Sequence, residues 1–176
     1  TVRTEASERG PNDLFTESAD SRLIVEPLRA LKATSVMSNG QYSMMVTAAG
    51  AGYSRYGDIA ITRWQADPVE DRLGSFIFLR DAESSDWWSA TAEPKVMPGE
   101  KTQTHFSDDK ACFFKTVGTL RSEVECIVAS EGDGEGRRVT LWNDGDTNRF
   151  IEVTYAGGDT AWVAQMLSRI TGSQLV

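Results

Sequence analysis

A stretch rich in aromatic and charged side chains, GYSRYGDIAITRW, carries the clearest chemical signal in the sequence. Tyr53 and Trp64 offer flat apolar faces with a polar edge, while Arg55, Asp58 and Arg63 offer charge-assisted hydrogen bonds. A sugar presents apolar C–H faces and a ring of hydroxyls, so this set suits a saccharide. An alternative stays open, in which the rings pack in a core beneath an Arg55–Asp58 or Asp58–Arg63 ion pair.

Two further features belong to the same hypothesis. Gly50 and Gly52 precede the stretch and allow a sharp turn and a close approach to a ligand. Trp87 and Trp88 are adjacent, so on a strand they face opposite sides and at most one belongs to the core. The candidate substrate-binding residues are Tyr53, Ser54, Arg55, Asp58, Arg63, Trp64 and Trp88.

Other kinds of chemistry find little support. His105 is the one histidine, and it falls in a strand-like segment where we expect it to be half-exposed. No serine sits on a strand–turn–helix elbow, and no phosphate-binding loop is present. Cys112 and Cys126 indicate buried free thiols in a reducing compartment. We therefore expect no catalytic residue, no metal and no cofactor.

The acidic run EGDGEG, residues 131–136, has two readings. Its carboxylates alternate with glycine and could hold calcium, which prefers oxygen ligands. The commoner reading is a solvated loop between strands.

Length and charge bound the class of protein. The chain has 176 residues and a formal net charge of −8, which argues against nucleic acid or an anionic membrane surface as partner. No apolar run is long enough to span a bilayer, and the N-terminus lacks a signal-peptide core. We expect a cytoplasmic location, one form of which is the cytoplasmic part of an inner-membrane enzyme.

The elements that must position these residues are mostly strands. Short apolar runs with alternating faces recur from residue 41 to 155, which favours an all-β, antiparallel β-sandwich. Asp144-Gly145-Asp146 is typical of a hairpin turn. One short C-terminal helix is expected, because five apolar residues share a helical face: Trp162, Val163, Met166, Leu167 and Ile170.

Three segments follow from this pattern. Residues 1–33 are expected to form a polar arm or linker, with one helical turn around Ser21–Val25. Residues 34–156 form the β-sandwich, and residues 157–176 form the helical tail.

An ordered run of motifs resembles the β-sandwich of the phosphorylase-like region of cyclic β-1,2-glucan synthases, which are relatives of cellobiose and chitobiose phosphorylases in glycoside hydrolase family 94. The resemblance covers residues 36–156. The motifs are MSNGQYSMMVTAAGAGYSRYGDIAITRWQADPVEDRLGSFIFLRD, WSAT..P, THFSDDKACFF and RRVTLWNDGDTNRFIEVTYA. The chain departs from the family at Tyr56 and Gly57, where relatives carry a tryptophan and a charged residue, and at Glu93, where many carry a glutamine.

The resemblance implies a partial supersandwich that precedes an (α/α)₆ barrel, and it places the general acid in that barrel. The chain alone is then an inactive part of an enzyme, shaping a saccharide-binding cleft. The implied partners are a weakly bound β-glucan or oligosaccharide and a catalytic barrel in the parent protein. A sheet edge left exposed by missing strands also allows a homodimer. Two alternatives stay open, a stand-alone carbohydrate-binding module and a dimerisation or interaction domain.

Overall fold

A computed structural model describes residues 21–28, 33–62, 73–157 and 164–170. Within these segments the regular elements are thirteen strands, and none is a helix. The strands are β1 Arg22–Val25, β2 Thr34–Ser38, β3 Tyr42–Thr47, β4 Gly52–Tyr56, β5 Ile59–Ala60, β6 Ser75–Asp81, β7 Trp87–Ser89, β8 Lys101–Phe106, β9 Lys110–Val117, β10 Leu120–Val128, β11 Glu135–Asn143, β12 Arg149–Gly157 and β13 Ala164–Ile170.

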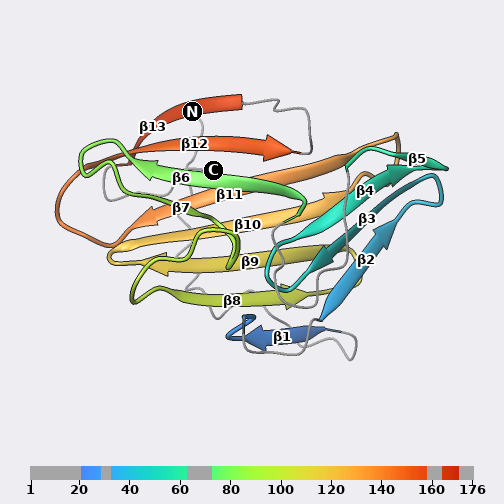
Figure 1. Ribbon diagram of the computed structural model, residues 1–176, viewed down its shortest axis with the longest axis horizontal. Helices are drawn as coiled ribbons and strands as arrows, with labels where there is room; N and C mark the ends of the chain where they lie inside the picture. Colours follow the sequence, from blue (N-terminus) through green and yellow to red (C-terminus); the bar gives the residue numbers. More distant parts are fainter. Residues whose placement is uncertain (1–20, 29–32, 63–72, 158–163, 171–176) are drawn as a thin grey trace, which may run out of the picture.

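The strands form three antiparallel sheets (Figure 1). The largest has five strands in the order β1-β8-β9-β10-β11. Two four-stranded sheets have the orders β13-β12-β6-β7 and β2-β3-β4-β5. The expected all-β antiparallel architecture is therefore confirmed.

Alternation along each strand decides which side chains are buried. In β10, Leu120, Val124 and Cys126 are each 2% exposed, whereas Glu123 and Glu125 lie on the other face. This agrees with the period of two that the sequence shows there. In β6, the central strand between β12 and β7, Leu79 is fully buried.

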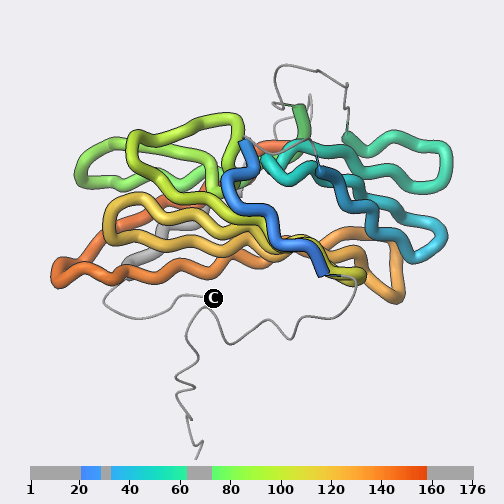
Figure 2. Tube along the Cα trace, turned by 90° about the horizontal axis from the view of Figure 1, so that it is seen from below, coloured from blue at the N-terminus to red at the C-terminus, as the bar shows by residue number. Residues whose placement is uncertain are grey.

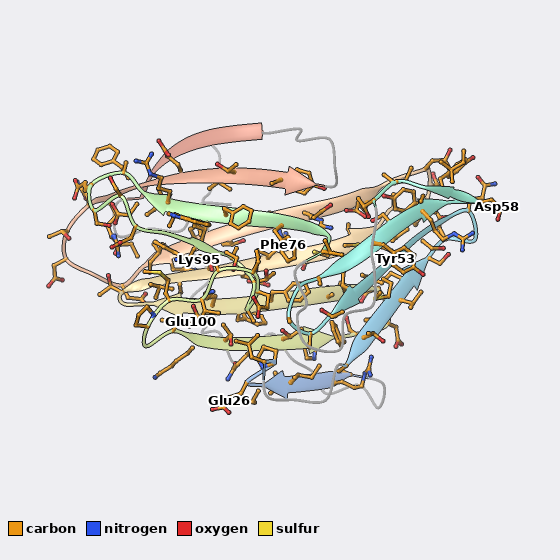
Figure 3. The ribbon with its side chains drawn as sticks, in the orientation of Figure 1. Glu26, Tyr53, Asp58, Phe76, Lys95 and Glu100 are labelled. Carbon is orange, nitrogen blue, oxygen red and sulfur yellow. The ribbon has the colours of Figure 1, made fainter. Side chains whose placement is uncertain are left out.

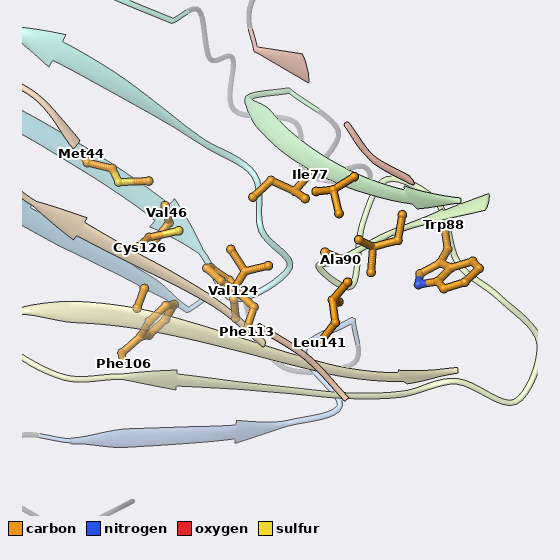
Figure 4. Close-up of a cluster of buried hydrophobic side chains, with 14 of the residues drawn as sticks. Met44, Val46, Ile77, Trp88, Ala90, Phe106, Phe113, Val124, Cys126 and Leu141 are labelled. Carbon is orange, nitrogen blue, oxygen red and sulfur yellow. The ribbon is translucent and has the colours of Figure 1, made fainter. Parts of the chain in front are cut away.

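Both four-stranded sheets pack on one face of the five-stranded sheet. Figure 2 shows the two layers, with β2–β7 above β8–β11. One core cluster joins them, with contributions from every sheet, and Figure 4 shows its central residues. It includes Met44 and Val46 from β3, Leu79 from β6, and Phe113 and Val124 from the facing sheet. We call the layer of two small sheets the outer layer, and its face away from this core the outer face.

The C-terminal helix is a correction. Residues 164–170, inside the segment expected to be helical, form β13, which pairs antiparallel with β12 from Arg149↔Ile170 to Tyr155↔Ala164. The apolar set follows the helical period, but long-range pairing with β12 overrides this local pattern. Pairing covers an edge of β12 that would otherwise expose unpaired backbone groups. The rest of the expected tail, residues 158–163 and 171–176, lies outside the described residues.

The helical turn expected around Ser21–Val25 is also wrong. Residues 22–25 form β1, which pairs antiparallel with β8 and extends the five-stranded sheet. Long-range pairing overrides the weak local preference of a four-residue segment.

The described segments contain no helix that is long and apolar enough to cross a membrane.

Candidate functional site

The residues predicted to bind a sugar lie mainly on β4 and the turn after it. Tyr53 and Arg55 are two positions apart and share the outer face of the strand, while Ser54 points to the opposite face. Arg55 Nη2 lies 3.2 Å from Asp58 Oδ1, and Arg55 Nε donates to the Gly57 carbonyl at 2.8 Å. We call Tyr53, Arg55 and Asp58 the Tyr53 surface.

The Arg55–Asp58 pair has a feature of both interpretations that the sequence left open, a saccharide site and an ion pair above buried rings. It is an ion pair, but its side chains are 45% and 107% exposed, so it does not cover a buried ring. An exposed pair of this kind contributes about 0–1 kcal/mol to stability. Both groups are therefore accessible to a ligand at little structural cost.

Ser54 corrects the predicted set, because it points into the molecule. It is 2% exposed, and its hydroxyl is hydrogen bonded to the carboxylate of Glu135. Tyr42 also donates to Glu135, at 3.1 Å, and Arg137 Nη2 lies 3.0 Å from the same carboxylate. We call these four residues and Tyr155, whose ring lies 5.6 Å from the Arg137 guanidinium carbon, the Glu135 cluster.

The Glu135 cluster ties the three sheets together. Its members come from β3, β4, β11 and β12, and Arg137 Nη1 also donates to the Ser75 carbonyl of β6 at 2.6 Å. Burial, with the nearby Glu135 charge, raises the pKa of Tyr42, although a hydrogen bond with Ser54 opposes the shift. The phenol thus stays protonated and remains a donor to Glu135. Ser54 therefore holds the sheets together rather than facing a ligand.

The acidic run does not gather its carboxylates. Glu135 belongs to β11 and to the cluster just described, whereas Glu131 and Asp133 are exposed in the preceding turn. This placement agrees with the loop reading for the turn itself.

Arg63 and Trp64 lie outside the described residues, so their part in the site stays a prediction. Their described neighbour Thr62 accepts a hydrogen bond from the Ser54 backbone N–H at 2.8 Å through its hydroxyl. The chain immediately before them is therefore tied to β4.

The two adjacent tryptophans face opposite sides, as alternation predicts, but the exposed one is Trp87 and not the predicted Trp88. Trp88 is 2% exposed and lies in the core opposite Leu79, so its burial contradicts a sugar-facing role. Trp87 is 47% exposed on the outer face of β7. The accessible aromatic side chain is thus the one that the sequence hypothesis left out.

The glycines of the AAGAGYS segment, together with Gly74, allow close contacts with other parts of the chain. Gly50 has φ +103°, and a Cβ there would overlap the Thr91 side chain. A Cβ on Gly52 would overlap the Met45 carbonyl oxygen, and one on Gly74 would lie 2.8 Å from the Gly52 nitrogen. These glycines let three segments meet, so the expected approach to a ligand is replaced by an approach to other parts of the chain.

A buried lysine holds the loop between β7 and β8. Lys115 Nζ lies 2.9 Å from Glu100 Oε2, and the two side chains are 0% and 7% exposed. The same ammonium donates to the carbonyls of Thr91 at 2.9 Å and Lys95 at 3.3 Å. Sequence reasoning missed this residue, because a single lysine within a strand resembles an ordinary solvent-facing charge.

The cysteines are free and buried, as expected. Burial raises the pKa of Cys112 to about 12 and that of Cys126 to about 11. Cys112 lies 4.8 Å or less from ligand atoms of Glu123 and Glu125. Glu125 is already paired with Lys110 and Arg138, each at 3.2 Å. Both thiols are therefore held in the protonated form, and Glu125 beside Cys112 is balanced by two cations.

His105 is more buried than the sequence suggested. It is 7% exposed on β8, between its cross-strand partners Leu23 and Cys112. Burial, reinforced by the positive charge of Lys110, lowers the pKa of His105. The imidazole is thus held neutral within the sheet.

Stability is expected to fall as the pH is lowered from about 6.5, the ordinary histidine pKa. The unfolded chain takes up a proton near that pH, whereas folded His105 takes it up only at a lower pH. The stability from the neutral imidazole is thus present above about pH 6.5 and lost as the pH falls through the folded pKa. Urea denaturation between about pH 5 and 8 should show this slope, and His105→Gln should flatten it. The same slope in wild type and variant would contradict this account.

Comparisons with known proteins agree with this architecture. The family model described as "Glycosyl hydrolase 94, supersandwich domain" matches residues 21–165. The chain is also 58% identical over 150 residues to the cyclic beta-(1,2)-glucan synthase NdvB of Rhizobium meliloti (strain 1021). That match covers 85% of this chain and 5% of the relative. The chain belongs to glycosyl hydrolase family 94, as a supersandwich domain.

Proposed function

We propose that this chain is the non-catalytic supersandwich part of an enzyme that makes or processes β-1,2-glucan, and that its Tyr53 surface contributes to a saccharide-binding cleft. The observation that supports this most is the 58% identity to a protein named as a cyclic glucan synthase. The exposed Tyr53 surface adds a local reason, because an aromatic ring beside a charged pair suits sugar hydroxyls and C–H faces. Catalysis then belongs to an (α/α)₆ barrel elsewhere in the longer protein.

The carboxylates of the described segments support a non-catalytic role. A general acid in glycoside chemistry needs a raised pKa, which burial usually provides. Asp58 is fully exposed and paired with Arg55, so it lacks the buried surroundings that a general acid uses. Glu123 has a pKa raised by burial and by the neighbouring Glu125, but it lies on the five-stranded sheet in the other layer.

Binding of a β-1,2-gluco-oligosaccharide should shift the amide signals of residues 53–58 in NMR spectra of the isotope-labelled chain. We expect a Kd in the millimolar range, because a few hydrogen bonds of about 1 kcal/mol each barely offset the cost of association. Arg55→Ala and Tyr53→Ala should each abolish these shifts without lowering the melting temperature.

Leu23→Ala provides the control for that titration. Leu23 is 59% exposed on β1, in the other layer, and its replacement should leave the shifts intact. Full retention of the shifts in Arg55→Ala and Tyr53→Ala would refute the Tyr53 surface as a sugar site. Micromolar affinity would favour the stand-alone carbohydrate-binding module instead.

Exposed apolar side chains at a sheet edge support a second candidate, a dimerisation domain. β2 and β5 are the outer strands of their four-stranded sheet, and Val36 and Ile59 on them are 66% and 64% exposed. Uncovered sheet edges are places where a second chain can add. A concentration-dependent mass in sedimentation that Ile59→Lys abolishes, without sugar binding, would favour this candidate.

A further inference from the structure

A second exposed surface lies on the other sheet of the outer layer. It is formed by five side chains that we call the Trp87 surface: Phe78, Arg80, Trp87, Lys95 and Glu152. Strand alternation puts four of them on the outer face, because their neighbours Leu79, Trp88 and Ile151 point into the core and are 2% exposed or less. Lys95 reaches the same face from the loop after β7.

Aromatic contacts fix the ring of Trp87 in place. Its centroid lies 5.8 Å from that of Phe78 in an edge-to-face arrangement of 67°. The ring centroids of Phe78 and Phe76 lie 6.4 Å apart, so the row of aromatic rings continues along β6. The Lys95 ammonium lies 5.2 Å from the Trp87 centroid. Trp87 nevertheless remains 47% exposed, so one tryptophan is both oriented and accessible.

Hydrogen-bonding groups stand directly beside this ring. Arg80 is the cross-strand partner of Trp87 on one side and of Glu152 on the other, so the three residues form one row. Arg80 Nη1 lies 3.0 Å from Glu152 Oε2. Neighbouring strands are about 4.8 Å apart, so the backbone of Arg80 lies one strand spacing from that of Trp87 and the backbone of Glu152 lies two.

The loop that supplies Lys95 is held rigidly from below. The buried Lys115 ammonium binds the Lys95 carbonyl at 3.3 Å, and the Ser89 hydroxyl bonds to the Lys95 backbone at 3.0 and 3.1 Å. Groups that are already ordered lose less conformational entropy on binding a ligand. The backbone of the Trp87 surface is therefore prepared for contact before any ligand arrives.

We propose that the Trp87 surface is a second saccharide-binding site, which holds a glucan chain outside the cleft formed at the Tyr53 surface. The indole would stack against the C–H face of a glucose unit, with Lys95 moving aside to bond a hydroxyl. Arg80 and Glu152 would bond hydroxyls of the same or the next unit. The inference rests on the proposed function in one respect, the choice of a glucan as ligand.

The ion pair in the row favours a sugar over a protein partner. A flat protein face would desolvate Arg80 and Glu152, and charged residues are depleted at the centres of protein interfaces for that reason. Sugar hydroxyls can replace the water around both groups and keep them hydrogen bonded. The ligand is therefore expected to be neutral and rich in hydroxyls.

Distance between the two surfaces makes them separable by experiment. Figure 3 shows Lys95 toward one end of the molecule and Tyr53 and Asp58 toward the other, with Phe76 between them. A titration of the labelled chain with β-1,2-gluco-oligosaccharide can follow the Trp87 indole N–H, assigned by its loss in Trp87→Phe, together with the amides of residues 53–58.

The expected result is a saturable shift of the Trp87 indole signal. Trp87→Ala should weaken the Kd measured from the Arg80 and Lys95 amides by about tenfold, which is the effect of losing an aromatic contact. Glu152→Gln should weaken it less, and Leu23→Ala should leave it unchanged. Equal melting temperatures would show that each variant is folded.

Each other outcome decides between the two proposals. Shifts at residues 53–58 with a silent Trp87 indole would overturn this inference and leave the proposed function standing. Shifts at Trp87 with silent residues 53–58 would support the inference and reject the Tyr53 surface. Shifts of the Arg80 and Lys95 amides that persist with an unchanged Kd in Trp87→Ala would also overturn it, as would silence at both surfaces.

Discussion

Replacing Lys115 with methionine is expected to lower the free energy of unfolding by about 3–5 kcal/mol, the usual result of removing one member of a buried ion pair. Glu100 would be left as a buried carboxylate without its cation, since its side chain is 7% exposed. The carbonyls of Thr91 and Lys95 would also lose a donor. Urea denaturation gives the change directly, as a shift in midpoint at constant slope.

Two variants control this prediction. Lys110→Met removes a pair with Glu125 in which the lysine side chain is 39% exposed, and it should cost about 0–1 kcal/mol. The double variant Lys115→Met with Glu100→Gln should recover part of the loss, because no buried charge remains unpaired. A loss in Lys115→Met no larger than that in Lys110→Met would contradict the assigned role of the buried pair.

Gly52→Ala is expected to destabilise the protein by about 3 kcal/mol, the upper end of the usual cost of overpacking, because the added methyl group overlaps backbone that cannot rotate away. The atom it meets is the carbonyl oxygen of Met45, on the neighbouring strand β3. Relief requires moving β4, which also carries Tyr53 and Ser54. We expect a lower denaturation midpoint, and loss of the fold if the remaining stability is small.

Gly134→Ala is the matched control for that variant. A Cβ at Gly134 meets nothing within 4 Å, and the residue has no positive φ. Its replacement should change stability by no more than about 0.5 kcal/mol, as for other surface positions. Equal effects of the two substitutions would mean that the close approach of β3 and β4 does not limit the fold.

The strands could be predicted from the sequence because alternation is a local property. The apolar residues of β10 repeat every second position, and the structure buries that set. The partner of each strand is not a local property. Asp144-Gly145-Asp146 looks like a hairpin turn, yet β11 and β12 belong to different sheets, so the turn carries the chain from one layer to the other.

The candidate site was predictable in part, for the same physical reason. Alternation places Tyr53 and Arg55 on one face and excludes Ser54, which a motif-based choice included. It also predicts that one tryptophan of the adjacent pair is exposed. Deciding which tryptophan is exposed requires the pairing of β7 with β6, which places Trp88 opposite Leu79.

Buried charges were beyond prediction, because their partners come from distant segments. Lys115 and Glu100 meet through the loop after β7, and Glu135 meets Ser54 across 81 positions of sequence. Only the folded chain brings such groups together. These contacts nevertheless decide how firmly the outer layer is held, and thus how well its two surfaces are prepared for a ligand.

The most direct test of binding without catalysis is one NMR sample that contains the labelled chain, a β-1,2-gluco-oligosaccharide and phosphate. Protein signals should shift on the outer layer, at residues 53–58 and at Trp87, while the anomeric signals of the sugar stay unchanged over a day. New sugar phosphate or reducing-end signals, absent from a heat-denatured sample, would contradict the account, as would shifts confined to the five-stranded sheet.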